Sequence, residues 1–262
     1  MTSPLARTGR RRASARMQID PERDLIEQLT PERAMVVMAH PDDCEFTSGG
    51  TVALLCSKGW AVDIVVATSG NRGTKDPRVT SQQLAAEREE EQRAAARVLG
   101  ANEPVFFGFP DGELVNDDEL RGLIVRQIRI HRPELVITWD GFRPGTNHRD
   151  HRRVGRATYD AIYPASDDHL YYVLHKEEGL QPHRPLAMLF AGSDQPDYHV
   201  DVEPVLGTKV RAVLAHRSQM GARTEDDMLR LWRERARAAQ AEGEEGRDPV
   251  FRESFRQMTF RR

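Results

Sequence analysis

The stretch Ala39-His40-Pro41-Asp42-Asp43 places an imidazole, a rigid turn residue and two adjacent carboxylates within one short segment. Histidine and aspartate side chains bind divalent metal ions, and catalytic zinc sites typically use three protein ligands and leave one position for water. A second polar segment, Asn147-His148-Arg149-Asp150-His151, lies far downstream. Histidines one helical turn apart project to the same side of a helix. Together the two segments indicate a metal site.

A ligand set of two histidines and one carboxylate can be assembled from these segments. His40 and His151 offer neutral imidazoles and Asp43 offers a carboxylate, and this combination leaves a coordination position for water. The set suits Zn²⁺, and it also suits non-haem Fe²⁺ or another divalent ion, so the residue types alone leave the metal open. The predicted metal ligands are therefore His40, Asp43 and His151.

The other polar residues of the two segments can supply acid–base chemistry. Asp42 is adjacent to Asp43 but points in a different direction, so it can take the proton of a water molecule whose pKa zinc lowers to about 7. His148 can polarise a developing oxyanion or protonate a leaving nitrogen, and Asp150 can hold the required tautomer. We therefore predict Asp42, His148 and Asp150 as catalytic residues in the metal-assisted hydrolysis of an amide or ester.

Strand and helix patterns alternate along the chain and place both segments in loops. The run 34–39 predicts a buried strand ahead of His40, and 134–139 predicts another ahead of His148. Further strands are expected at 61–67, 104–107, 186–190 and 198–202, with helices at 24–29, 49–58, 80–99, 117–131, 154–162 and 208–218. Such alternation predicts an α/β fold, with a mostly parallel sheet, helices on both faces and the polar loops at the carboxyl ends of the strands.

Length and composition bound the class of protein. The chain has 262 residues, a formal net charge of −3 and a pI near 6.3, which gives no general case for binding nucleic acid. No apolar stretch approaches the roughly 18 residues of a membrane span. Cys44 and Cys56 cannot form a disulfide framework, so we expect a cytoplasmic protein. No GxGxxG follows the first strand, which disfavours a dinucleotide-dependent oxidoreductase.

We expect one domain with an irregular C-terminal part. Residues 1–20 carry several arginines and no hydrophobic region, which predicts a disordered basic tail. Residues 21–220 contain the alternating pattern and both polar segments, and form the predicted catalytic domain. Residues 221–262 are dominated by charges, with Met228 and Trp232 among their few apolar anchors. This composition predicts a helical extension that packs on the domain or on a neighbouring subunit.

The two polar motifs, Ala39-His40-Pro41-Asp42-Asp43 and His148-Arg149-Asp150-His151, resemble those of the LmbE-like (PIG-L) zinc-dependent N-acetylglucosaminyl deacetylases. The similarity is nearest to the chitobiose deacetylase branch of that family and covers roughly residues 34–220. Weaker matches extend over residues 68–73, 88–100, 110–114 and 209–219. The resemblance implies a Rossmann-like sheet in a single domain.

The resemblance implies that His40, Asp43 and His151 bind the metal and that Asp42 is the general base. The residue chemistry predicts the same roles. It further implies that Arg88 and Asp111 contact a sugar, and His216 in the late matching segment is a third candidate substrate-binding residue. The implied reaction is removal of the N-acetyl group from a GlcNAc-type sugar or glycoconjugate by a zinc-bound water. Asn71 stands where many members carry glutamate, a departure that concerns substrate contacts and leaves the metal set intact.

Simpler structural roles are the alternatives for several of these residues. Asp43 and His148 can cap the helices that follow them. Arg88 can lie on a solvated helix face, and Asp111 can serve the turn Pro110-Asp111-Gly112.

Other functions stay open as well. A thiol-conjugate amidase of the mycothiol type would use the same metal ligands on a larger amide, and a non-catalytic sugar-binding relative would keep the fold without turnover. We expect an N-acetylated amino-sugar substrate and no nucleic-acid or membrane partner. A homo-oligomer is a further option that the charged C-terminal helix leaves open.

Overall fold

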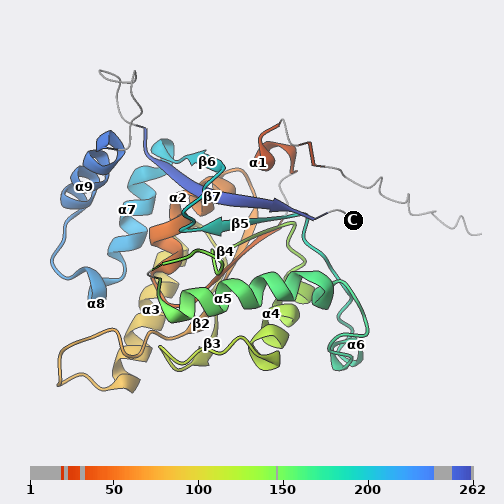
Figure 1. Ribbon diagram of the computed structural model, residues 1–262. Coiled ribbons are helices and arrows are strands. Elements are labelled where there is room, and N and C mark those ends of the chain that lie inside the picture. Colours follow the sequence, from red (N-terminus) through yellow and green to blue (C-terminus); the bar gives the residue numbers. More distant parts are fainter. Residues whose placement is uncertain (1–18, 21–22, 30–32, 146, 239–249, 261–262) are drawn as a thin grey trace, which may run out of the picture.

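A seven-stranded sheet with the order β3-β2-β1-β4-β5-β7-β6 forms the centre of the molecule (Figure 1). The computed structural model describes residues 19–20, 23–29, 33–145, 147–238 and 250–260. The strands are β1 (Arg33–Met38), β2 (Ala61–Thr68), β3 (Val105–Phe109), β4 (Leu135–Trp139), β5 (Ala187–Ala191), β6 (Tyr198–Asp201) and β7 (Arg252–Thr259). The predicted basic tail at residues 1–20 lies almost wholly outside the described residues.

The strands from β1 to β5 pair in parallel, and β7 runs antiparallel between β5 and β6. The chain proceeds from β1 through β2 to β3 on one side, and β4 and β5 lie on the other side of β1. The strand order therefore reverses between β1 and β4, and open α/β sheets bind their ligands at the carboxyl ends of the strands at such a point. This geometry confirms the predicted α/β fold with a mostly parallel sheet.

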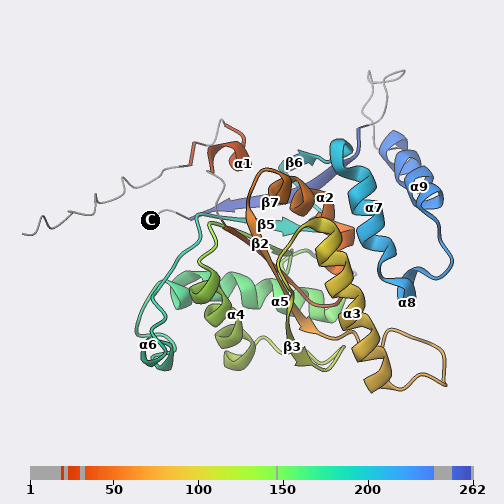
Figure 2. The ribbon, with the colours of Figure 1, turned by 180° about the vertical axis from the view of Figure 1, so that it is seen from behind.

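Helices cover both faces of the sheet, as the two views in Figures 1 and 2 show. The helices are α1 (Leu25–Gln28), α2 (Asp43–Ser57), α3 (Ser81–Leu99), α4 (Asp118–His131), α5 (Arg149–Asp160), α6 (Leu174–Glu177), α7 (Leu206–Leu214), α8 (Arg217–Met220) and α9 (Glu225–Ala238), with short helical turns η1 (Ala161–Ser166) and η2 (Glu203–Val205). Across the described part of the chain, none of these helices has both the length and the hydrophobicity that a membrane span requires.

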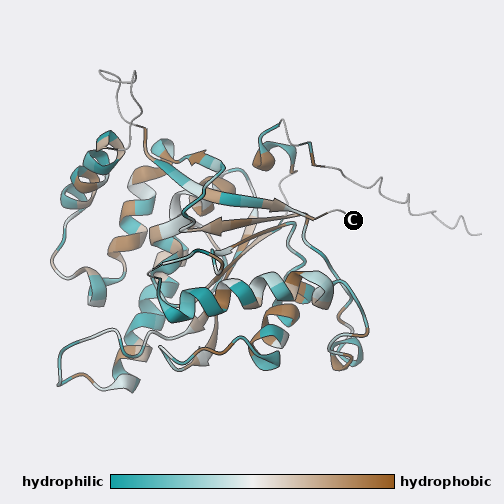
Figure 3. Cartoon of the chain, in the orientation of Figure 1, coloured by the Kyte–Doolittle hydropathy of each residue, from teal (hydrophilic) through white to brown (hydrophobic). Residues whose placement is uncertain are grey.

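Alternating side chains of the strands fill two separate cores. In β1, Val36 and Met38 face helices α2, α3 and α7, whereas Met35 and Val37 face α4, α5 and η1. Successive residues of a strand point to opposite faces, so a strand buried on both sides is apolar at every position. Figure 3 shows this as brown central strands between helices that carry teal outer surfaces. The unbroken apolar runs in the sequence follow from this double burial.

Helix α2 begins earlier than the predicted range of 49–58, because its first turn includes the polar loop after β1. The backbone N–H of Asp43 donates to the carbonyl of His40 (3.3 Å), which starts the helix directly behind the strand. The glycine pair at 49–50 lies inside the helix, where it permits close packing. A Cβ on Gly50 would come within 2.6 Å of the Cβ of Val202. The glycines therefore serve helix–chain contact and do not mark the helix start.

The long helix α3 has the ends that its sequence predicts. Thr80 and Gln83 form a reciprocal capping box at its start, and Gly100 ends it in the left-handed conformation. Its buried face carries Leu84 and Ala95, and it also carries the polar residues Arg88 and Gln92. Two hydrophilic side chains are thus directed inward, toward the loop that follows β1.

The C-terminal segment differs from the helical extension expected for residues 221–262. Helix α9 is present and packs on α7 through Met228 and Trp232, but residues 252–259 form strand β7 inside the sheet. The strand was missed because its inward positions include Glu253, and Phe255 is the only large apolar residue buried along it. A buried carboxylate removes the hydrophobic alternation by which a strand is usually detected.

Glu253 is buried because it holds the main chain of helix α2. Its carboxylate accepts the backbone N–H groups of Gly50 (2.8 Å) and Thr51 (2.7 Å) and pairs with the ammonium of Lys209. Lys209 also donates to the carbonyl of Phe46 (2.9 Å), the group to which the N–H of Gly50 would bond in a regular α-helix. The ion pair therefore bonds to main-chain groups of α2 and links this helix to α7 and β7.

Lys209→Met should lower the free energy of unfolding of the metal-free protein by about 3–5 kcal/mol, because it leaves the Glu253 carboxylate buried without its cation. Urea denaturation measures the change. Arg230→Met is the matched control, since Arg230 pairs with Asp227 at an exposed site (71% and 47% side-chain exposure) and should change stability by less than about 1 kcal/mol. Equal, small effects of both variants would contradict the buried pair.

Candidate metal centre

The two predicted polar segments meet at the carboxyl ends of β1 and β4, where the strand order reverses. His40 follows β1 directly, and His148 is the N-cap of α5, the helix that follows β4. The pairing of β1 with β4 fixes this meeting, because Ala34 lies opposite Leu135 and Val37 opposite Thr138. Sequence-distant residues therefore share one edge of the sheet.

The three predicted metal ligands bring their donor atoms together. His40 Nδ1 lies 3.2 Å from His151 Nε2, and His151 Nε2 lies 3.2 Å from Asp43 Oδ1. The second carboxylate oxygen, Asp43 Oδ2, is 3.5 Å from His40 Nδ1. His40 and Asp43 are buried, with exposed fractions of 8% and 6%. The side chains of all three predicted ligands thus lie in mutual contact.

These spacings fit a divalent cation. Donor atoms that each lie about 2.0–2.1 Å from one tetrahedral ion are separated from one another by about 3.3 Å. His151 Nε2 lies at this distance, 3.2 Å, from both His40 Nδ1 and Asp43 Oδ1. Nitrogen and oxygen donors in this combination suit Zn²⁺ as well as Fe²⁺.

The second nitrogen of His40 is held by carboxylates. His40 Nε2 lies 3.1 Å from Asp111 Oδ1 and 3.4 Å from Asp150 Oδ2. Burial alone would lower the pKa of His40, but hydrogen bonds to the three surrounding carboxylates outweigh burial and raise the pKa to about 11. A ligating histidine commonly donates its other ring N–H to a carboxylate in this way. Nε2 therefore carries a proton, and Nδ1 is the nitrogen turned toward Asp43 and His151.

Two groupings of donors around His40 are geometrically able to hold an ion. Within the described residues, His40, His148 and His151 form one, and His40, Asp111 and Asp150 form the other, each with donor atoms within 4.8 Å of one another. Asp150 already accepts the backbone N–H groups of Gly112 (2.6 Å) and Leu114 (3.2 Å). Neither grouping is the predicted set of His40, Asp43 and His151, which shares His40 and His151 with the first. The carboxylates of the second grouping are engaged in orienting His40 and the loop after β3.

The carboxylates of Asp150 and Asp111 both lie beside His40 Nε2. The carboxylate of Asp150 is directed at His40 and not at His148, whose tautomer it was expected to hold. That tautomer is set by the Asp150 main chain, because its N–H donates to His148 Nδ1 (3.2 Å). Asp111 also faces His40, and the predicted sugar contact of Asp111 stays a prediction.

His148 lies at the exposed side of the cluster. Its ring is 4.6 Å from that of His40 in an edge-on arrangement and 5.0 Å from that of His151. Partial burial, together with the neighbouring His40 and His151, lowers the pKa of His148. Because Nδ1 accepts a main-chain hydrogen bond, the neutral ring carries its proton on Nε2. His148 can therefore donate a hydrogen bond to a group that enters from solvent.

Asp42 is held in an unusual backbone conformation next to the ligand Asp43. Its φ of 94° lies in the left-handed region, which costs a non-glycine residue on the order of 1–3 kcal/mol and recurs at functional sites. Gln92 accepts its backbone N–H (3.1 Å), and Arg88 binds its Oδ2 (3.1 Å). Burial and the adjacent Asp43 raise the pKa of the Asp42 carboxyl to about 7. The carboxylate is thus fixed in place and poised to take up a proton.

Arg88 lies behind Asp42 and not in an open substrate site. It is 4% exposed, and its guanidinium donates to the carbonyls of Pro41 (2.6 Å) and Gly70 (2.9 Å) as well as to Asp42. These contacts use both terminal nitrogens of Arg88, and its Nε is buried without a hydrogen-bond partner. The arrangement favours a positioning role for this arginine.

His216 is also enclosed by the chain. It has no exposed surface, and its Nε2 lies 3.2 Å from Oε2 of Glu45, which is equally buried. Glu45 in turn accepts from Gln92 (2.7 Å), the residue that holds the Asp42 main chain. Substrate binding by His216 therefore receives no support from its place in the structure. Burial would lower the pKa of His216, but Glu45 outweighs it and raises the pKa.

Sequence analysis missed Trp139, the last residue of β4. Its ring stacks on His151 with centroids 3.9 Å apart and planes inclined by 9°, and its indole Nε1 donates to Asp43 Oδ2 (3.0 Å). The sequence signal that could have identified Trp139 is its position: it is a large aromatic residue at the carboxyl end of a strand that leads into a polar motif. Trp139 is therefore in contact with two of the three predicted ligands.

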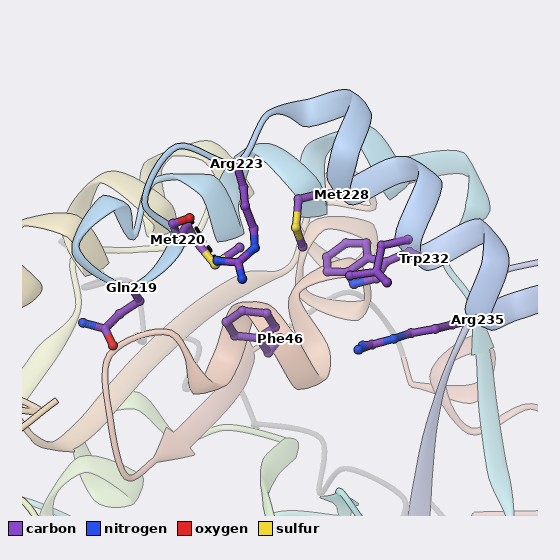
Figure 4. A pocket seen from close by; sticks show the side chains of 8 residues that line it. Phe46, Gln219, Met220, Arg223, Met228, Trp232 and Arg235 are labelled. Carbon is purple, nitrogen blue, oxygen red and sulfur yellow. Dashed lines mark hydrogen bonds between the residues drawn. The ribbon is translucent and has the colours of Figure 1, made fainter. Parts of the chain in front are cut away.

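A separate hollow of about 330 Å³ lies between α2, α8 and α9 (Figure 4). Figure 4 shows Arg223 and Arg235 directed toward the aromatic side chains of Phe46 and Trp232. None of the predicted catalytic, metal-binding or substrate-binding residues lines this hollow. It is distinct from the histidine cluster.

Fold and site together define an α/β protein with a cluster of histidine and aspartate side chains, able to hold a metal ion, at the switch point of its sheet. The family model PIG-L, described as GlcNAc-PI de-N-acetylase, matches residues 35–162, which include both motifs. A diacetylchitobiose deacetylase of Thermococcus kodakarensis is 34% identical over 201 residues, covering 77% of this chain and 73% of the relative. The chain belongs to this PIG-L (LmbE-like) family.

Two further comparisons agree with this membership. The structure of N,N'-diacetylchitobiose deacetylase from Pyrococcus horikoshii has a TM-score of 0.77 and 28% identity, covering 87% of this chain and 84% of that protein. A mycothiol S-conjugate amidase of Streptomyces coelicolor is 31% identical over 160 residues, covering 53% of this chain and 54% of the relative. The family resemblance and the fold predicted from the sequence are confirmed.

Asp42→Asn should stabilise the metal-free protein at pH 8 by about 1–3 kcal/mol, and the gain should vanish toward pH 4. The pKa of Asp42 rises from 3.8 to about 7 on folding, so between these values the folded state keeps a proton that the unfolded state releases. The stability contributed by Asp42 therefore falls as pH rises, whereas asparagine does not titrate. Urea midpoints at both pH values measure the difference, and a gain independent of pH would refute it.

Proposed function

We propose that this chain is a metal-dependent N-deacetylase that hydrolyses the acetamide of a GlcNAc-type sugar or glycoconjugate to acetate and a free amine. Membership of the PIG-L family and the likeness to diacetylchitobiose deacetylases support deacetylation of such substrates. The observation that carries the proposal is the convergence of His40, Asp43 and His151, in which His151 Nε2 lies 3.2 Å from both His40 Nδ1 and Asp43 Oδ1, beside the strained Asp42.

In this proposal His40 Nδ1, His151 Nε2 and Asp43 hold the cation, which we take to be Zn²⁺. A cation bound there polarises the substrate carbonyl and lowers the pKa of a bound water to about 7. Fe²⁺ suits the same ligands, so elemental analysis of the purified protein decides the metal. The carboxylates at His40 Nε2 keep this imidazole in the tautomer that presents Nδ1.

Asp42 is the general base of the proposed reaction. It takes a proton from the attacking water while the water oxygen forms its bond to the acetamide carbon. Arg88 and Gln92 fix the Asp42 carboxylate and main chain, so little reorientation is needed at that moment. The same proton can then pass to the departing nitrogen, so that the carbon–nitrogen bond breaks and leaves acetic acid and a neutral amine. The acid keeps the second proton of the attacking water and releases it to solvent, which gives acetate.

His148 is the proposed electrophilic partner. Its Nδ1 is occupied by the Asp150 N–H, so the neutral ring directs an Nε2–H toward solvent at the edge of the cluster. This donor stabilises the negative charge that develops on the carbonyl oxygen, and positioned donors of this kind are among the largest contributions to catalysis. The lowered pKa of His148 keeps the ring neutral.

The proposed partners follow from the same site. We take the substrate to be an N-acetylated amino sugar, with Asp111 at the rim of the cluster (13% side-chain exposure) as the remaining candidate for a sugar contact. We place the enzyme in the cytoplasm, because Cys44 and Cys56 are both free thiols. Assembly into a homo-oligomer stays part of the proposal, and gel filtration tests it.

An amidase that cleaves a larger amide is the second candidate, because a mycothiol S-conjugate amidase is among the relatives. It would use the same ligands, base and donor, and it would differ only in the acyl group that it removes. Incubation with GlcNAc, diacetylchitobiose, a GlcNAc–inositol conjugate and a mycothiol S-conjugate separates the two. Acetate release from the sugars supports the deacetylase, and cleavage of the S-conjugate alone supports the amidase.

Asp42→Asn should reduce acetate release by at least about 10²-fold while the protein still binds one equivalent of Zn²⁺, because the change removes the base and spares the ligands. A coupled acetate assay and metal analysis of the same preparation measure both quantities. His151→Ala is the comparison, since it should lose both metal and activity. Undiminished turnover in the metal-loaded Asp42→Asn protein would exclude Asp42 as the base.

His148→Ala should lower kcat by about 10²–10³-fold, the usual effect of removing one donor to a developing oxyanion, with unchanged Zn²⁺ content. His148→Gln, which keeps an N–H donor, should recover part of the loss. Steady-state kinetics and metal analysis provide the readouts. Loss of Zn²⁺ from His148→Ala would assign His148 to the ligands, as the grouping of the three histidines permits.

A further inference from the structure

Trp139 contacts the proposed metal ligands from two different directions. It is the last residue of β4, and its indole ring lies between Asp43 at the start of α2 and His151 in the first turn of α5. Among the described residues, it alone combines a parallel aromatic stack on one of these ligands with a hydrogen bond to another. Trp139 itself offers no metal-binding atom, since the indole N–H is a donor only.

The indole distinguishes the two oxygens of Asp43. Asp43 Oδ2 accepts both the Trp139 Nε1–H (3.0 Å) and the backbone N–H of His40 (2.9 Å). These two donors occupy Oδ2, and Oδ1 is the oxygen that faces His151 Nε2 at 3.2 Å. A carboxylate with one oxygen engaged in this way is pre-oriented to bind a cation through the other.

The stack on His151 fixes the plane of that imidazole. The two rings are nearly parallel, with a 9° angle and centroids 3.9 Å apart. A ring held in this plane keeps His151 Nε2 at 3.2 Å from His40 Nδ1. Rotation of the imidazole about its χ2 angle would break the stack and carry Nε2 away from the other donors. The stack therefore limits the freedom that metal binding must otherwise remove.

The indole also packs against the loop after β5. Gly192 has a φ of 66°, and a Cβ at this position would lie 2.5 Å from Cζ3 of Trp139. The backbone N–H of Asp140 donates to the carbonyl of Ala191 (2.9 Å), which keeps the ends of β4 and β5 together. Trp139 thus contacts the main chain at Gly192 as well as the imidazole of His151.

We propose that Trp139 is a positioning residue that prearranges Asp43 and His151 for the metal ion. The inference rests on the proposed metal centre, and it adds a residue that neither the motifs nor the ligand chemistry identifies. Outer partners of metal ligands typically contribute 10–100-fold to metal affinity or activity. The indole acts before any substrate arrives, so its contribution is measured on Zn²⁺ binding itself.

Trp139→Phe tests the proposal, because phenylalanine keeps a ring for the stack and removes the N–H to Asp43. The dissociation constant for Zn²⁺, determined by competition with a chromophoric chelator, should rise about 10–100-fold. Trp60→Phe is the matched control: Trp60 is a core tryptophan, 5% exposed, in the cluster beneath α2 and α3. It should lower the thermal midpoint of the metal-free protein and leave the Zn²⁺ dissociation constant unchanged.

A measurement on the unmodified chain covers the case in which the Trp139 variant folds poorly. The indole N–H signal of Trp139 in a ¹H–¹⁵N spectrum should move when Zn²⁺ is added, because its acceptor is a metal ligand, and the Trp60 signal should stay in place. Absence of any shift at Trp139 on saturation with Zn²⁺ would overturn the proposal. So would a folded Trp139→Phe protein with wild-type Zn²⁺ affinity.

Failure of this inference and failure of the metal centre are distinguishable. If wild-type protein binds Zn²⁺, His151→Ala loses it and Trp139→Phe retains it, the ligands stand and the positioning role of Trp139 falls. If His151→Ala binds Zn²⁺ as the wild type does, the metal centre itself is wrong and the tryptophan proposal falls with it.

Discussion

The buried carboxylate of Asp43 is the constraint on which the site depends. Burial opposes its ionisation, but His151 and His40 outweigh burial and hold the pKa of Asp43 well below its usual range. An anion at this depth requires donors on every side, and the chain provides a backbone N–H, an indole N–H and two imidazoles. These partners come from β4, α5 and the loop after β1. The sheet order that brings these elements together therefore also stabilises the buried charge of Asp43.

The meeting of the two motifs at one edge of the sheet could be predicted, because each motif follows a buried strand and contains metal-binding residue types. Their partners could not be predicted with the same ease. Arg88 and Gln92 lie on the buried face of α3 together with Leu84. A charged residue on an otherwise apolar helix face indicates that its side chain points inward, and this was the sequence signal for Arg88. The direction of the Asp150 carboxylate, toward His40, depends on how the loop after β3 folds back, and no local pattern contains that information.

The fold was accessible from the sequence where strands are buried on both faces, since they are apolar at each position and alternate with capped helices. The limits came from residues that break the pattern for tertiary reasons. Gly49 and Gly50 mark close packing inside α2 and not its start, and Glu253 places a charge on an inward face of β7 because it binds the main chain of α2. In both cases a distant contact decides what the local sequence only suggests.

The position of β7 has a consequence for the order in which the sheet can assemble. Among the described residues, strand β6 pairs with β7 alone, and β7 separates it from β5. During synthesis, residues 198–201 therefore leave the ribosome with no partner, and they can join the sheet only after residues 252–259 have followed. The parallel half of the sheet, from β3 to β5, carries both histidine motifs and is complete before that point. Pairing of β6 and β7 with the sheet is thus the late, non-local step during synthesis. The same step brings the Glu253 carboxylate to the main chain of α2.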